Sequence, residues 1–198
     1  MISMDKLFIS NIKFHIKFKE KLENYKSIIK TLKNRKCDNF YIFKLNSYTY
    51  ISFEKSINIT GCKNYSDIHE SIELFSLVFR RPLKTQDATI DNITATTNTQ
   101  CKISSCFIEK IANNNSKKIR FSLFPNFFPG IIIREAGCPT IVLFRNGKAN
   151  ILGAKTYPQL LRSHQRLMQI IHTLQDKNIR FGETQKVNIS YNYNFLYT

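Results

Sequence analysis

The sequence has no Cys-x-x-Cys pair and no long apolar segment. Its five cysteines are odd in number, and its four histidines do not cluster with them at the spacing of metal ligands. These absences argue against a disulfide framework and a zinc site, so we expect no metal, no other cofactor and a reducing environment. No apolar run approaches about 18 residues, and residues 1–6 do not begin a signal peptide. The sequence therefore predicts an intracellular protein that is neither secreted nor membrane-spanning.

The motifs of the common enzyme classes are missing too. There is no phosphate-binding loop, no nucleophile elbow and no His-Glu metalloprotease motif. The segment Asn146-Gly-Lys148 places a glycine before a lysine, but it lacks the spacing of a Walker loop. We therefore expect no catalytic residues and no small-molecule substrate, and the sequence favours a binding protein over an enzyme.

Acidic residues are scarce beside basic ones. The chain has 30 Lys and Arg against 14 Asp and Glu, a net charge of +16. Residues 1–84 hold 16 basic and 8 acidic side chains and residues 85–198 hold 14 and 6, so each part carries +8. An evenly basic surface predicts a polyanionic partner, with nucleic acid first. The abundance of Asn, Ile, Lys and Phe also fits an A·T-rich genome, such as that of a large DNA virus or a reduced eukaryote. The location would then be the nucleus or, for a viral protein, a cytoplasmic viral factory or the virion.

Three short apolar strands joined by turns occur twice in the same order. On pattern alone each set is an ordinary antiparallel meander, with Asn146-Gly147 placed where a two-residue hairpin needs positive φ. The ends match as Thr60-Gly-Cys-Lys63 and Leu152-Gly-Ala-Lys155, and Ile9-Ser-Asn-Ile12 and Ile90-Asp-Asn-Ile93 precede them. The chain is therefore interpreted as a tandem duplication, with repeat one at 1–84, repeat two at 85–180 and a tail at 181–198.

Each repeat reads as strand, helix, three strands, helix. Residues 19–33 and the segment that follows Ser66, a plausible N-cap, have helical periodicity; in repeat two we expect helices at 105–112 and from Pro158 onward. This order predicts an α+β fold in which one continuous antiparallel sheet has four helices on one face. The other face is then uncovered, and an uncovered face rich in aromatic and amide side chains is a binding surface.

The motifs of repeat two resemble those of the TATA-box-binding protein family. The matching segments are Phe-Pro-Gly at 128–130, Val-Leu-Phe at 142–144, Asn-Gly-Lys at 146–148 and Gly-Ala-Lys at 153–155. By the order of its elements the resemblance covers most of residues 7–175. It implies a saddle with approximate two-fold symmetry, whose concave sheet lies on the DNA minor groove and whose phenylalanines open base steps. The bend of about 80° is the known value for that family.

The resemblance also implies a set of DNA-binding residues. Phe40, Phe53, Phe128 and Phe144 would be the intercalating rings, and Asn11 and Asn92 the central amides, which can donate to adenine N3 or thymine O2. For each phenylalanine taken singly, packing in the core is the competing interpretation. The other residues expected on the same face are Lys13, Asn58, Thr60, Thr94, Val142, Asn150 and Leu152.

The chain departs from the family's pattern at several points. Lys13 and Thr94 stand where the family has apolar residues, Leu152 replaces a threonine, and the Phe40–Phe53 segment is short. Asn58 and Asn150 make the face more polar, and because an Asn carbonyl can accept from guanine N2, strict A·T preference is in doubt. The segment 123–127 lacks the acidic residues that the family presents to its factor-B-type partner.

Two functions from different classes remain open on the sequence. The first is a DNA-binding transcription initiation factor that binds and bends promoter DNA, A·T-rich by resemblance, and recruits a transcription factor B-like protein and RNA polymerase machinery. The alternative is a protein-interaction module in transcription that kept the fold and lost sequence-specific DNA binding.

Overall fold

The computed structural model describes residues 7–19, 25–37, 39–103, 119–124 and 128–175. Strands and helices follow the predicted order with one difference: after its first strand, each half has four further strands where three were predicted. The elements of the first half are β1 (Phe8–Lys17), α1 (Tyr25–Thr31), β2 (Asn34–Lys36), β3 (Tyr41–Leu45), β4 (Tyr48–Ser52), β5 (Ser56–Cys62) and α2 (Tyr65–Phe79). Those that follow are the 3-10 helix η1 (Thr85–Asp87), β6 (Thr89–Asn98), β7 (Ile119–Phe124), β8 (Phe128–Glu135), β9 (Thr140–Phe144), β10 (Lys148–Ala154) and α4 (Tyr157–Gln175).

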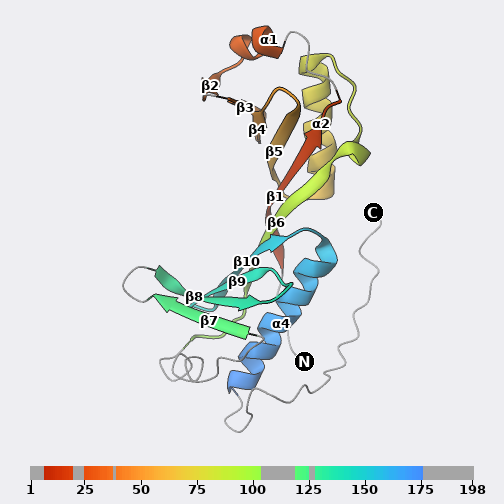
Figure 1. The fold of residues 1–198 in the computed structure, drawn as a ribbon. Coiled ribbons are helices and arrows are strands. Elements are labelled where there is room, and N and C mark those ends of the chain that lie inside the picture. The colour runs from red at the N-terminus through yellow and green to blue at the C-terminus, as the bar shows by residue number, and fades with distance from the viewer. Residues whose placement is uncertain (1–6, 20–24, 38, 104–118, 125–127, 176–198) are drawn as a thin grey trace.

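The ten strands of the described ranges form one sheet in the order β2-β3-β4-β5-β1-β6-β10-β9-β8-β7, and the paired strands are antiparallel. The order is the same on both sides of the central pair β1–β6. β5, β4, β3 and β2 follow β1 outward, and β10, β9, β8 and β7 follow β6 outward. Both ends of the sheet lie on one side in Figure 1, and α2 and α4 lie on the other. The predicted saddle with a continuous antiparallel sheet is confirmed.

The number of helices differs from the expectation of four. Three α-helices lie within the described ranges, and the helix expected at 105–112 falls outside them, as does the tail 181–198. In the same ranges, no helix is long and apolar enough to cross a membrane. The repeat limits 1–84 and 85–180 stay a prediction, although the central strand of the second half begins at Thr89.

The helix ends show which polar side chains set the boundaries. The prediction of Ser66 as the N-cap of α2 is wrong, because Asn64 holds that place and its Oδ1 accepts a hydrogen bond of 2.8 Å from the Asp67 N–H. Arg80 closes α2 in the left-handed conformation with φ 48°. α4 starts at Tyr157, one residue before Pro158, and Thr156 Oγ1 accepts from the Gln159 N–H.

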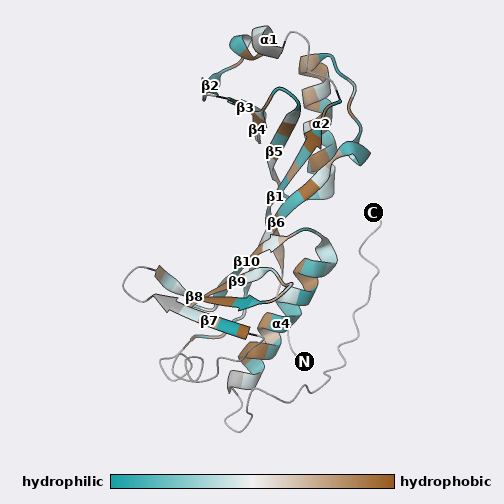
Figure 2. Ribbon diagram, viewed as in Figure 1, coloured by the Kyte–Doolittle hydropathy of each residue, from teal (hydrophilic) through white to brown (hydrophobic). Residues whose placement is uncertain are grey.

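Alternation along the strands divides the sheet into a covered and an uncovered face. On β1, Ile12, Phe14 and Ile16 are fully buried, and the residues between them are only half-buried. α2 and α4 cover the buried side, and Figure 2 shows both helices striped with hydrophobic and hydrophilic residues. The inner side of α4 is formed by Leu160, Leu167, Ile170 and Ile171. The amphipathic helices therefore leave the opposite sheet face without a covering layer.

The first half has an aromatic core that includes polar groups. Phe43 stacks on Tyr50 with ring centroids 5.2 Å apart, and the Tyr50 hydroxyl donates to the Ser71 carbonyl at 2.8 Å. Burial, together with a hydrogen bond to Glu70, raises the pKa of Tyr48 to about 12. Burial likewise raises the pKa of the Cys62 thiol to about 11. Both groups are neutral at physiological pH, as a core between sheet and helix requires.

Candidate nucleic-acid interface

The uncovered face is built from rows of residues that face one another across the strands. In the first half, Ile51 lies opposite Asn58, and Asn58 lies opposite His15. In the second half, Val142 lies opposite Asn150, and Asn150 lies opposite Thr96. Directly opposed residues share a face of a sheet, so these rows place the predicted Asn58, Asn150 and Val142 together on the uncovered side.

Two asparagines occupy equivalent places on the central strands. Asn11 Oδ1 accepts from the Gly61 N–H at 2.8 Å and from the Thr60 hydroxyl at 3.0 Å. Asn92 Oδ1 accepts from the Gly153 N–H at 2.9 Å. The missing second bond at Asn92 follows from Leu152, which has no hydroxyl where Thr60 has one. Each amide oxygen is thus used within the sheet.

The opposite end of each amide remains available to a ligand. Neither Nδ2 group has a hydrogen-bond partner among the residues that the structure describes. Because the oxygen is held by a backbone N–H, the orientation of each amide is fixed and its two N–H donors are left over. The uncovered face therefore presents hydrogen-bond donors at two symmetric positions near its middle.

Glycine is needed at the two residues that hold the amides. Gly61 and Gly153 have φ of +108° and +92°, in the region that side chains rarely adopt. Both lie where the pairing of β5 with β1 and of β10 with β6 is interrupted by a bulge. A Cβ at Gly61 would also lie 3.1 Å from the Ser47 carbonyl oxygen. The Gly-x-Lys ends of both halves thus have a structural reason.

A pair of aromatic rings lies near the outer end of the second half. The ring centroids of Phe128 and Phe144 are 6.2 Å apart, and a Cβ on Gly130 would lie 2.7 Å from Phe128 Cε1. Gly130 thus leaves room for the ring. A wedge role predicts largely exposed rings, but both rings are half-buried, and they pack against each other. Val142, only 6% exposed, lies under this pair, with Cγ1 2.8 Å from the same hypothetical Cβ.

The first half has a similar pair with a different register. The ring centroids of Phe40 and Phe53 are 5.5 Å apart. Tyr41 pairs with Ser52, so the next pair outward is Phe40 with Phe53. In the second half Gly130 is opposite Phe144, which places Phe128 two residues farther out. The two ring pairs are therefore not equivalent: Phe40 lies level with its partner, and Phe128 lies beyond its own.

The remaining predicted residues lie on the central strands and on β10. Lys13 is opposite Asn92, and Thr94 is opposite Asn11. Both side chains are half-buried, and Leu152 is 38% exposed. All thirteen predicted residues belong to the sheet or to the turns beside it, on strands whose other face carries the core.

Sequence reasoning missed three side chains on this face. His15 Nδ1 lies 2.8 Å from Asp91 Oδ1, an ion pair when the ring is protonated. Phe8 lies opposite Thr96 and is 58% exposed. The alternation of β1 contains the signal for His15, which follows Asn11 and Lys13 at even spacing. The sequence pattern does not indicate Asp91 and Phe8, because bulges at Ser10 and Asp91 shift the alternation of the two paired strands.

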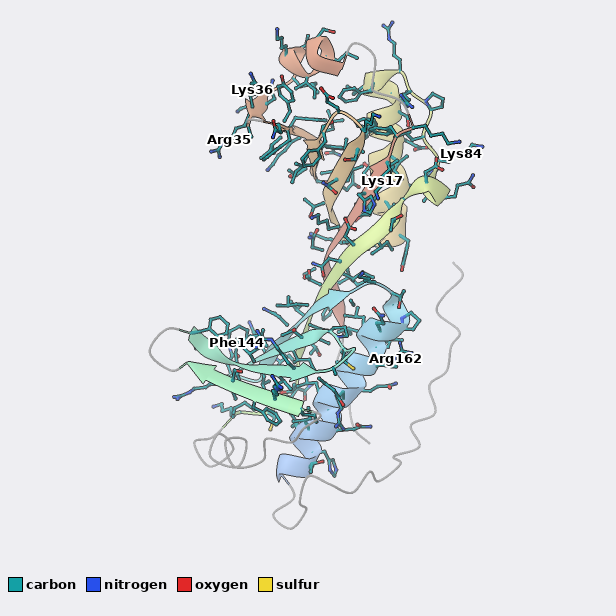
Figure 3. All side chains as sticks on the ribbon, viewed as in Figure 1. Lys17, Arg35, Lys36, Lys84, Phe144 and Arg162 are labelled. Carbon is teal, nitrogen blue, oxygen red and sulfur yellow. The ribbon has the colours of Figure 1, made fainter. Side chains whose placement is uncertain are left out.

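Two cations lie at the outer end of the first half. Figure 3 shows Arg35 and Lys36 at the tip of the first half and Phe144 toward the corresponding end of the second. Arg35 is opposite Ile42, which is opposite Ile51, so Arg35 extends the first row to the edge strand.

In the described part of the chain, no cluster of three or more His, Cys, Asp and Glu could hold a metal ion.

Comparisons with known proteins agree with this geometry. The family model described as "Transcription factor TFIID (or TATA-binding protein, TBP)" matches residues 87–174, the half whose motifs are specific. The TATA-box-binding protein of Tetrahymena thermophila is 24% identical over 135 residues. That match covers 66% of this chain and 53% of the relative, so the chain spans about half of the relative's length.

A solved structure shares the fold over nearly its whole length. Methanococcus jannaschii TBP aligns with a TM-score of 0.68 at 16% sequence identity, over 84% of this chain and 98% of that chain. At this identity the likeness concerns the fold. Together with the matched family model and the Tetrahymena relative, it shows that the chain is similar to TBP-family proteins, in fold over most of its length and in sequence over residues 87–174.

Proposed function

We propose that the protein binds the minor groove of A·T-rich double-stranded DNA through the uncovered sheet face and bends it, as a transcription initiation factor. The observation that carries this proposal is the pair of asparagines, Asn11 and Asn92, whose oxygens are held by glycine N–H groups. Their free N–H donors lie at symmetric positions, and a ring pair flanks them on each half. A donor-rich centre between aromatic ends matches the chemistry of an opened minor groove.

The direction of the amides predicts which bases are preferred. The minor groove of an A·T pair offers only the acceptors adenine N3 and thymine O2, and a G·C pair adds the guanine N2 donor. An outward Nδ2 of Asn11 or Asn92 therefore suits A·T and opposes guanine N2. Asn58 and Asn150 have no described partner that fixes their amides, so the positions over these residues tolerate G·C better.

The ring pairs supply the means of bending. A flat apolar ring that enters a base step replaces part of the stacking that is lost, and unstacking costs a few kcal/mol per step. Phe128 and Phe144 are already packed together on the second half. In the first half Phe40 lies level with Phe53, so we expect the weaker kink there.

A salt titration tests the proposal directly. Binding to an A·T-rich and a G·C-rich duplex of equal length is measured by fluorescence anisotropy between about 50 and 200 mM salt. Each phosphate neutralised adds about −0.9 to the slope of log affinity against log salt, so a protein of charge +16 should give a steep slope on both duplexes. We expect tighter binding to the A·T-rich duplex at every salt concentration. Flat salt dependence without preference would support the protein-interaction module instead.

Gly130 offers a second test, confined to one wedge. Gly130→Ala puts a Cβ 2.7 Å from Phe128 Cε1 and 2.8 Å from Val142 Cγ1, so the ring must move. We expect a smaller bend, measured by energy transfer between dyes at the two ends of the duplex, and a cost of about 1–3 kcal/mol in stability from overpacking. Gly137→Ala is the control: φ is +74°, so it is strained, but no atom lies within 4 Å of its Cβ. An unchanged bend with Gly130→Ala would contradict a wedge role for Phe128.

The proposal extends to the assembly partners of an initiation factor. The covered side, with α2 and α4, and the ends of the saddle remain free to contact a transcription factor B-like protein and RNA polymerase machinery. The segment 123–127 has no acidic residue. We therefore expect a partner of this kind to use a different, less basic contact, which a gel-shift assay with the factor-B-like protein of the same genome would detect as a slower complex.

A further inference from the structure

A carboxylate lies on the uncovered face beside one of the central amides. Asp91 is the extra residue of a β-bulge in the pairing of β6 with β1. Its neighbours pair with consecutive residues of β1, Ile90 with Phe14 and Asn92 with Lys13. Ile90 packs against the core, as Phe14 does, so the alternation turns the Asp91 side chain to the opposite face. The bulge thus places a negative group next to Asn92 on the candidate interface.

Acidic residues are scarce in the rest of the sheet. The ten described strands contain two carboxylates, Asp91 and Glu135. Glu135 accepts from Arg166 Nε of α4 at 3.1 Å and so belongs to the covered side. Asp91 is therefore the single carboxylate that the described strands present on the uncovered face. A negative group opposes the phosphates of a nucleic acid, so its place on a DNA-binding face needs a specific explanation.

His15 holds Asp91 in place and, when protonated, offsets its charge. The ring Nδ1 lies 2.8 Å from Asp91 Oδ1, and because a carboxylate can only accept, Nδ1 carries the hydrogen. Lys13 and Lys17 alternate with His15 along the same face of β1, and Figure 3 labels Lys17 near the end of this strand. An ion pair that solvent can reach adds little to stability, so the fold alone does not account for this carboxylate.

The second carboxylate oxygen remains available to a ligand. Among the residues that the structure describes, Asp91 Oδ2 has no hydrogen-bond partner, and the side chain is 31% exposed. In the minor groove, A·T pairs present only acceptors, and the one donor is the N2 amino group of guanine. An acceptor on the uncovered face is therefore complementary to guanine and opposes the edges of A·T pairs.

We propose that Asp91 is a specificity-determining residue whose Oδ2 accepts a hydrogen bond from the N2 amino group of one guanine within the A·T-rich site. This inference rests on the proposed minor-groove binding. The amides of Asn11 and Asn92 donate to A·T pairs, and the carboxylate beside Asn92 accepts from a G·C pair. The preferred sequence is then an A·T block that one G·C pair interrupts near its middle.

Inosine tests this inference, because an I·C pair differs from a G·C pair in the minor groove only by the missing N2 amino group. One such pair is moved through every position of an A·T block, in both strands and in both forms, and binding is measured by fluorescence anisotropy. In the test variant Asp91→Asn the amide oxygen can accept from the His15 ring, so a donor N–H group replaces Oδ2. Asp87→Asn is the matched control, because it removes the same charge from η1, outside the sheet.

We expect the parent protein to bind the G·C form about tenfold more tightly than the I·C form at one position near the middle of the block, since the I·C form lacks a hydrogen bond to a charged group. At that position Asp91→Asn should reverse the preference and Asp87→Asn should retain it. Thermal unfolding of both variants checks their fold, and the comparison within the parent protein needs no variant.

Two results would overturn the inference and leave minor-groove binding in place, provided that A·T-rich DNA is still preferred to G·C-rich DNA. The first is binding of the I·C form as tight as that of the G·C form, or tighter, at every position. The second is a preference for the G·C form that Asp91→Asn leaves unchanged. Failure of the parent protein to bind any of these duplexes would overturn both proposals.

Discussion

Replacing both central asparagines by aspartate is expected to reduce DNA affinity about a thousandfold and leave the fold intact. Aspartate has the same shape as asparagine, and its Oδ1 can still accept from the Gly61 or Gly153 N–H. Only the outward group changes, from an N–H donor to a charged acceptor. That acceptor would face adenine N3 and thymine O2, which are acceptors themselves, and the phosphates beyond them.

The magnitude follows from the cost of an unsatisfied buried group. An unpaired polar atom in an interface costs about 1–3 kcal/mol, and a charged one more. Two positions at about 2 kcal/mol each correspond to roughly a thousandfold, since about 1.4 kcal/mol is tenfold. The new carboxylate at position 92 faces Lys13 across the sheet, so we expect the larger single effect from Asn11→Asp.

The measurement is anisotropy on the A·T-rich duplex, with thermal unfolding measured in parallel. Gln86→Glu with Gln159→Glu is the matched control, because it adds the same two negative charges outside the sheet. Gln159 Oε1 accepts from the Lys155 N–H, and the glutamate oxygen can do the same. If the control weakens binding as much as the asparagine variant, the loss reflects net charge, and the amides are not the reading groups.

The sequence predicted the architecture well because the features that determine it are periodic. Alternation along β1 and the apolar stripe of α4 need only local spacing, and the same order of elements in both halves implies pseudo-symmetric pairing. Asn11 and Asn92 lie at equivalent positions of the two central strands. The sequence does not predict that their side-chain oxygens accept hydrogen bonds from glycine N–H groups. These bonds depend on bulges that bring Gly61 and Gly153 to the amides.

Other features escaped the sequence for physical reasons that can be named. The mutual packing of Phe128 and Phe144 depends on a register in which Gly130, and not Phe128, lies opposite Phe144. The His15–Asp91 pair joins residues 76 positions apart at a bulge. Asn64, and not Ser66, is the N-cap of α2, because the helix begins two residues earlier than the sequence pattern indicates. Local patterns predict which face a residue occupies, but register and bulges decide its neighbours.

Removal of the rings in the second half is expected to abolish most of the bend at little cost in stability. The double substitution Phe128→Ala with Phe144→Ala removes two rings whose main contact is with each other. Both rings are half-buried and lie on the sheet face without helices. A core Phe→Ala change costs about 3–5 kcal/mol. For two half-buried rings that share one contact we expect a fall of only a few degrees in melting temperature. Phe14→Ala, on the covered face of β1 and fully buried, is the control that should unfold.

The same pair of rings can be compared with the pair in the first half. Phe40→Ala with Phe53→Ala removes two rings as well, but Phe40 lies level with its partner and reaches less far beyond the sheet. End-to-end energy transfer on a labelled duplex should therefore show a larger loss of bending for the second-half variant than for the first-half variant. Both variants should retain a salt-dependent affinity, because the lysines and arginines are untouched. If the second-half variant is destabilised as severely as Phe14→Ala, these rings belong to the core. If the bend is unchanged, the rings do not act as wedges.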